Sequence, residues 1–173
     1  MKTGWWRGLL VLTLLTACAP AKGARDWASI PPVRTEETRS FDVRFEPLKK
    51  DKRFFVSFRL DIRNKTDRAL TIDWNKTRYL HNGRPNGVFV FRGIDPATIK
   101  KTIPSETIAP KTTFSREIFP AHLVAFTPMR EEVLDKKGEG LFPGPLPAGE
   151  NGISLSVRQD GKEMVQELSV EIR

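Results

Sequence analysis

The chain has 173 residues, with 29 Lys and Arg against 21 Asp and Glu, and one cysteine. This length can supply the apolar core of one domain. A single cysteine excludes a disulfide within the chain and a site with several thiolate ligands, so stability must come from packing.

The N-terminal residues have the pattern of an export signal. Lys2 and Arg7 precede or flank a short apolar run at residues 9–15, and no acidic residue occurs before Asp26. The run is much shorter than the roughly 20 residues of a membrane-spanning helix. We therefore expect residues 1–17 to be a cleaved signal peptide rather than a stable membrane span.

Leu15-Thr16-Ala17-Cys18 resembles the lipobox of bacterial lipoproteins, in which one large and two small residues precede an invariant cysteine. The resemblance implies that the Cys18 thiol receives a diacylglyceryl group and that the signal is cut just before it. Two or three acyl chains on one residue form a lasting membrane anchor. Ala19 implies an outer-membrane position facing the periplasm if the host is Gram-negative. The alternative is an ordinary signal peptide with an incidental cysteine.

Residues 18–40 are expected to be the lipidated cysteine and a flexible tether. They are polar, and Pro31 and Pro32 interrupt them. Trp27 and Ile30 are the large apolar side chains of this stretch, and the sequence leaves open whether they dock on the domain or on the membrane interface.

The charge of the chain suggests acidic neighbours. A basic protein in the cytosol could bind nucleic acid, but an exported and lipidated chain does not normally meet it, so we expect no nucleic-acid partner. Anionic lipid headgroups, lipopolysaccharide and cell-wall polymers remain. The basic clusters at residues 49–53, 100–101 and 136–137 are typical of solvated surface.

Apolar and polar residues alternate from residue 41 onward. Residues 41–46 predict one strand and residues 54–63 a longer one, because Phe58, Leu60 and Ile62 alternate with polar residues. Asn64-Lys65-Thr66-Asp67 favours a turn, and a further strand is expected over residues 70–74. We predict that the strands at residues 54–63 and 70–74 form a hairpin.

The second half of the domain contains further strand and turn signals. Turns at Asn82-Gly83 and residues 85–87 precede an apolar strand at 88–91, and another strand is expected at 114–118. Residues 127–138 predict one short helix, with capping residues at both ends. Strands at 153–157 and 164–172 flank an Asp160-Gly161 turn.

These elements predict a mainly β domain over residues 41–173. Short strands separated by turn signals favour an antiparallel immunoglobulin-like β-sandwich with one short helix, and a small β-barrel is the alternative. Trp74 lies on the expected third strand, where that fold often buries a tryptophan.

The sequence shows no catalytic pattern. It has no Gly-x-Ser-x-Gly motif and no phosphate-binding glycine loop, so we expect no enzyme and no cofactor. His81 and His122 are the only histidines. A copper carrier would need Met129 and Met164 to converge with them, and the spacing fits no metal site that we can justify. The sequons beginning at Asn64 and Asn75 are interpreted as turn residues.

We expect a possible binding surface at Tyr79, His81, Arg84 and Asn86, because binding residues favour loops on a rigid scaffold. The competing interpretation is that Trp74 and Tyr79 pack in the core. The leading hypothesis is a lipid-anchored envelope protein that acts as a non-catalytic binding or structural module for a protein, glycan or lipid. A periplasmic ligand or metal carrier is the alternative, and an envelope hydrolase comes third.

Overall fold

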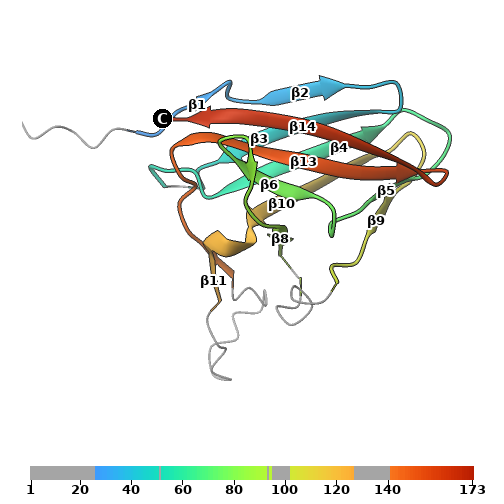
Figure 1. Cartoon of the computed structure of the whole chain (residues 1–173). Helices are drawn as coiled ribbons and strands as arrows, with labels where there is room; N and C mark the ends of the chain where they lie inside the picture. Colours follow the sequence, from blue (N-terminus) through green and yellow to red (C-terminus); the bar gives the residue numbers. More distant parts are fainter. Residues whose placement is uncertain (1–25, 51, 93, 95–101, 127–140) are drawn as a thin grey trace, which may run out of the picture.

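The computed structural model describes residues 26–50, 52–92, 94, 102–126 and 141–173. Two antiparallel sheets face each other (Figure 1). The first contains, in spatial order, β2 (Arg34–Glu37), β3 (Phe41–Leu48), β4 (Ser57–Asn64), β10 (Thr113–Pro120) and β8 (Phe89–Phe91).

The second sheet contains, in spatial order, β1 (Ser29–Ile30), β14 (Lys162–Ile172), β13 (Gly149–Gln159), β5 (Leu70–Ile72) and β9 (Glu106–Ile108). On the side of β5, β13 also pairs with β6 (Arg78–His81), which carries β7 (Arg84–Pro85). A separate ribbon is formed by β11 (Val124–Phe126) and β12 (Leu141–Pro143), and a 3₁₀ turn at Ala121–Leu123 precedes it.

The fold is the predicted antiparallel β-sandwich, and the barrel alternative is wrong because the sheets do not close on themselves. The order β3-β4-β10-β8 facing β14-β13-β5 matches the A-B-E-D and G-F-C order of immunoglobulin-type sandwiches. The predicted helix over residues 127–138 lies outside the described residues, as does Cys18.

The core lies between the sheets and follows the predicted alternation. Phe58, Leu60 and Ile62 on β4 are fully buried, whereas Arg59 between them and Arg63 after them are exposed. The Phe45 ring on β3 stacks on Phe58 with 4.3 Å between ring centroids. Burial of each such side chain contributes about 1.5–3 kcal/mol, so these strands are fixed by their inward faces.

The domain begins earlier than predicted, because residues assigned to the tether form two strands. Ser29 of β1 pairs with Ile172 of β14, and Arg34 of β2 pairs with Phe45 of β3. The Ile30–Pro31 peptide bond between the two strands is cis. As edge strands, β1 and β2 each bond to one neighbour and expose most of their side chains. Their polar composition therefore resembles that of a linker.

The position of Trp27 settles one open question. Its side chain is partly buried and packs against the core, so it docks on the domain. Ile30, in contrast, remains 52% exposed. The segment between Cys18 and the folded domain is therefore much shorter than the predicted tether of residues 18–40.

The predicted hairpin between residues 54–63 and 70–74 is wrong. The chain leaves β4 in one sheet and enters β5 in the other, so residues 65–69 form an arch across the core. The same turn residues suit a hairpin and an arch, and the difference depends on which partners the side chains find. Among the described strands, the consecutive ones that pair with each other are β2–β3, β3–β4, β6–β7, β11–β12 and β13–β14.

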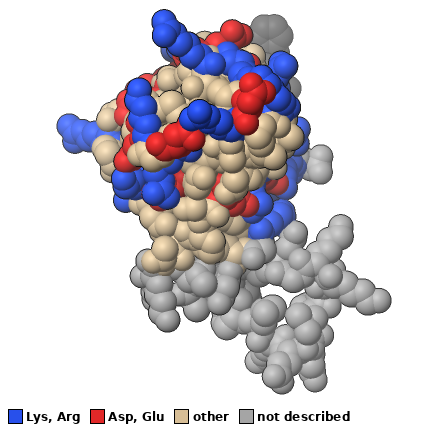
Figure 2. Space-filling model, turned by 90° about the vertical axis from the view of Figure 1, so that its right-hand side faces the viewer, with Lys and Arg blue, Asp and Glu red and all other residues tan. Residues whose placement is uncertain are grey.

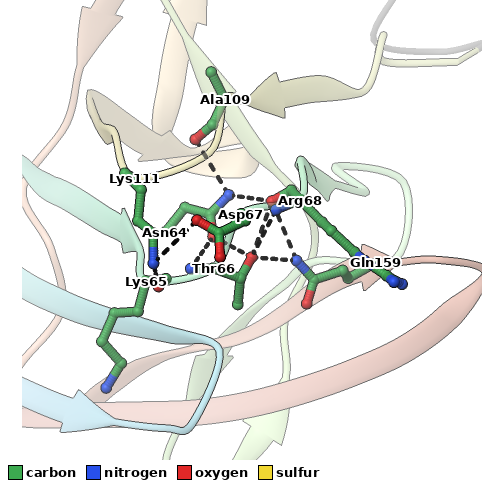
Figure 3. A network of polar contacts seen from close by, with 8 residues as sticks. All are labelled: Asn64, Lys65, Thr66, Asp67, Arg68, Ala109, Lys111 and Gln159. Carbon is green, nitrogen blue, oxygen red and sulfur yellow. Dashed lines mark hydrogen bonds and ion pairs between the residues drawn. The ribbon is translucent and has the colours of Figure 1, made fainter.

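Asn64 holds this arch in place (Figure 3). Its buried amide donates to the backbone oxygens of Arg68 at 2.7 Å, Ala109 at 3.2 Å and Ile108 at 3.3 Å. Its Oδ1 accepts from the N–H and the hydroxyl of Thr66 at 3.0 and 2.8 Å. The side chain therefore joins β4, the arch and the chain beyond β9.

Both sequons serve as turn residues, as predicted. Besides Asn64, the amide of Asn75 donates to the Ile103 carbonyl at 2.7 Å and accepts from the Ile103 N–H at 2.8 Å. Trp74, which precedes Asn75 in the sequence, is fully buried, and its indole N–H donates to Glu106 at 3.0 Å. Trp74 lies just after β5 rather than on it, but it occupies the core as expected.

Tyr79 on β6 is a core residue. Its ring is fully buried, with its centroid 5.8 Å from that of Phe89, and its hydroxyl donates to Oδ1 of Asn151. Asn151 is also buried, and its amide donates to the carbonyls of Pro147 and Gly149, each at 2.9 Å. Burial raises the pKa of Tyr79, so its phenol stays neutral when an exposed tyrosine would ionise.

Replacing Asn64 by Ala should lower the free energy of unfolding by about 2–3 kcal/mol, because buried backbone groups of the arch lose their partners. Urea unfolding of the full chain measures this loss. The matched control is Asn86→Ala, at an exposed loop asparagine, which should change stability by less than about 0.5 kcal/mol. Equal losses for the two variants would contradict the role of Asn64.

The stability of the folded chain should fall as pH rises above the ordinary tyrosine pKa of 10.0. In that range the unfolded chain has lost the phenolic proton and the folded chain keeps it, a difference of up to about 1.4 kcal/mol per pH unit. Tyr79 is the only tyrosine, so tyrosinate absorbance reports this group alone. Ionisation near pH 10 in a chain that is still folded would refute it. In the control Tyr79→Phe, the alkaline fall in stability should be smaller by this contribution.

Candidate functional site

The candidate site is the surface around the β6–β7 hairpin. The hairpin turns at Asn82-Gly83, where both residues have positive φ, 51° and 70°, as a type I′ turn requires. Asn82 fixes the turn to the neighbouring strand, because its N–H donates to the Glu150 carbonyl at 2.9 Å and its Oδ1 accepts from the Glu150 N–H at 3.1 Å. The hairpin is therefore anchored on β13.

The structure separates the four predicted binding residues. His81 and Arg84 pair directly across the hairpin, and Arg84 and Asn86 are exposed. Tyr79 is buried and cannot contact a partner at the surface, so its place in the predicted surface is wrong and the competing core interpretation holds. Tyr79 instead holds the chain that carries the surface residues, because its backbone forms hydrogen bonds with the backbone of residues 86 and 87.

His122 joins this surface from a distant part of the sequence. It lies in the 3₁₀ turn, its ring centroid is 5.6 Å from that of Tyr79, and its Nε2 lies 3.5 Å from the Asn86 amide. Gly87 lies beside the ring, and its φ of 98° is a backbone conformation that residues with a side chain rarely adopt. From the sequence, His122 was considered only as a possible metal ligand, and no sequence pattern indicated its contact with Tyr79 and Asn86.

The surroundings of His122 disfavour its charged ring. Partial burial, and then the charge of His81, lower the pKa of His122, which favours its neutral ring near pH 7. The Nε2 of His81 lies 3.1 Å from the Ala148 carbonyl, a distance that suits an N–H donor. The exposed guanidinium of Arg84 adds N–H donors, which suit a partner rich in acceptors or negative charge.

Among the described residues, Met164 does not lie near His81, as the copper site considered from the sequence would require. Met164 pairs with Val157 on β13, whereas His81 pairs with Asn151, six residues along the same strand. Six residues of strand span about 20 Å, so Met164 does not converge with His81. Met129 lies outside the described residues. Within the described ranges, no group of three or more His, Cys, Asp and Glu is placed to hold a metal ion.

Among the residues that the structure describes, no helix has the length and apolar character needed to cross a bilayer. A comparison of the sequence with models of known protein families finds no match. A search of curated proteins likewise finds none with significant similarity. The residues and their geometry therefore carry the functional proposal.

Proposed function

We propose that this chain is a membrane-anchored lipoprotein of the bacterial envelope, whose β-sandwich acts as a non-catalytic binding or structural module. The observation that carries the proposal is the Leu15-Thr16-Ala17-Cys18 sequence behind a short apolar run. The thiol of Cys18 would carry the acyl chains, and Cys18 is the only cysteine.

The way the chain enters the sandwich supports an anchored module. Ala28 and Arg173 exchange backbone hydrogen bonds of 2.8 and 2.9 Å, so the N-terminal segment enters beside the C-terminus (Figure 1). Trp27 lies nine positions after Cys18, and nine residues of fully extended chain span about 30 Å. The sandwich would stay close to the bilayer that carries the anchor.

The hairpin surface supports binding rather than catalysis. Arg84, Asn86 and the His81 ring project from a hairpin that core packing and the Asn82 contacts hold rigid. A rigid scaffold with polar loop residues is the common arrangement of recognition sites. An envelope protein, glycan or lipid rich in acceptor groups fits these donors.

Cys18→Ser should abolish labelling of the chain by a radioactive fatty acid and release it from the membrane fraction, because serine lacks the thiol that is acylated. Labelling is measured in bacterial cells that express the full chain. The matched control is Thr16→Ser, which keeps a small residue in the motif and should retain the label. A label that persists on Cys18→Ser would disprove the anchor.

A photoreactive amino acid at Arg84 should crosslink to one envelope component in cells, because Arg84 lies in the proposed binding surface. The control places the same amino acid at Arg39, which is exposed in the turn between β2 and β3, at the other end of β3 from the loop beside Trp27. The proposal expects a discrete adduct at Arg84 that is absent at Arg39. The same adducts at both positions, or none at either, would count against a binding module at the hairpin.

A further inference from the structure

The loop between β3 and β4 concentrates positive charge. Residues 49–53 contain Lys49, Lys50, Lys52 and Arg53, with Asp51 as the one carboxylate of this segment. Lys50 pairs with Glu117 at 2.5 Å. Lys49, Lys52 and Arg53 form no ion pair with any described residue, and we call these three the basic loop.

The base of this loop is held in place by aromatic packing. The Phe55 side chain is 7% exposed and belongs to the core, and its carbonyl accepts from Leu146 N–H at 2.8 Å. The Lys49 ammonium lies 5.3 Å from the Phe55 ring centroid, and that of Lys52 lies 5.6 Å from Phe54. The ammonium groups of Lys49 and Lys52 therefore lie beside aromatic rings, one of which belongs to the core.

The basic loop lies where the N-terminal segment joins the sandwich. The Trp27 N–H donates to the Arg53 carbonyl at 3.2 Å, directly next to the Ala28–Arg173 pair. The exposed Arg173 beside it pairs with Glu171 at 3.7 Å, so the unpaired cations described there are those of the basic loop. The end of the sandwich that the anchor would hold near the membrane therefore carries unneutralised positive charge.

The opposite end of the sandwich has a different charge pattern. Figure 2 shows basic and acidic side chains interspersed on that side. There Lys65 pairs with Asp42 at 2.6 Å, Lys111 lies 3.4 Å from Asp67, and Arg68 pairs with Asp160. Several cations at the far end thus have carboxylate partners, and three without one in the described part of the chain, Arg39, Arg63 and Lys162, lie on separate strands and turns. The three cations of the basic loop lie within one short segment and have no carboxylate partner among the described residues.

We infer that the basic loop binds the headgroups of anionic phospholipids and holds the sandwich end-on against the membrane. This inference rests on the proposed anchor, which brings the loop close to the bilayer. Electrostatic attraction acts within about 8 Å at physiological salt, and the short link to Cys18 allows that approach. Each lysine or arginine near an anionic surface raises binding about fivefold.

The test measures sedimentation of the full chain with vesicles, with Cys18→Ser in every sample so that no acyl chain contributes. Binding to vesicles of equal parts phosphatidylcholine and phosphatidylglycerol should exceed binding to phosphatidylcholine alone and should fall with added salt. The triple variant Lys49→Gln, Lys52→Gln, Arg53→Gln should lower the partition coefficient on the order of 100-fold.

The matched control removes three exposed cations from the opposite end, with Arg39→Gln, Arg63→Gln and Lys162→Gln. This control has the same net charge as the first triple variant, but it should bind the vesicles as well as the parent chain does. Equal losses in both triple variants, or no preference for anionic vesicles, would overturn the inference. If circular dichroism shows the first triple variant to be unfolded, the double variant Lys52→Gln, Arg53→Gln should still lose binding on the order of 25-fold.

The anchor and the loop can fail separately. Loss of fatty-acid labelling in Cys18→Ser tests the anchor alone, whereas the vesicle assay lacks the acyl group and tests the loop alone. If the chain binds vesicles but is not acylated in cells, the proposed anchor is refuted and the proposed lipid-binding surface is retained. Acylation without vesicle selectivity would leave the anchor and reject the end-on orientation.

Discussion

The burial of two apolar sheet faces against each other is the constraint on which the other features depend. Phe45 and Phe58 from one sheet, and Ile153 and Leu155 from the other, have no exposed surface. These side chains fix the strands, so the segments that the core does not fix lie at the ends and edges of the sandwich. The arch, the β6–β7 hairpin and the basic loop all lie in such places, each tied to the core by one or two buried residues.

Local sequence pattern was sufficient for the strands that have one buried and one solvated face. The alternation over residues 41–46 and 54–63 predicts β3 and β4, and Asp160-Gly161 predicts the β13–β14 turn, where both residues have positive φ. Pattern was insufficient where a strand is an edge, as in β1 and β2, because exposed polar residues carry no period. It also could not separate an arch from a hairpin, since Asn64 finds its distant acceptors only in the folded chain.

The candidate site was predicted in part. Turn chemistry located the hairpin and its exposed Arg84 and Asn86, but β6 is too short for its pattern to decide whether Tyr79 faces the core or the surface. His122 reaches the same surface from 36 residues beyond Asn86, a contact that depends on the path of β10 and the 3₁₀ turn. Burial and long-range contacts, which sequence spacing does not encode, decided both outcomes.

The order of strands in the second sheet also has a mechanical consequence. The entering strand β1 and the hairpin strand β6 belong to the same sheet, with β14 and β13 between them. A pull between the membrane and a partner held at the hairpin would pass through the antiparallel hydrogen bonds of these four strands. Because β1 pairs with β14 at Glu171 and Ile172, and β6 pairs with β13 at residues 151–154, that load would pass through the Gly149–Ile172 end of the β13–β14 ladder. The facing sheet would be largely bypassed.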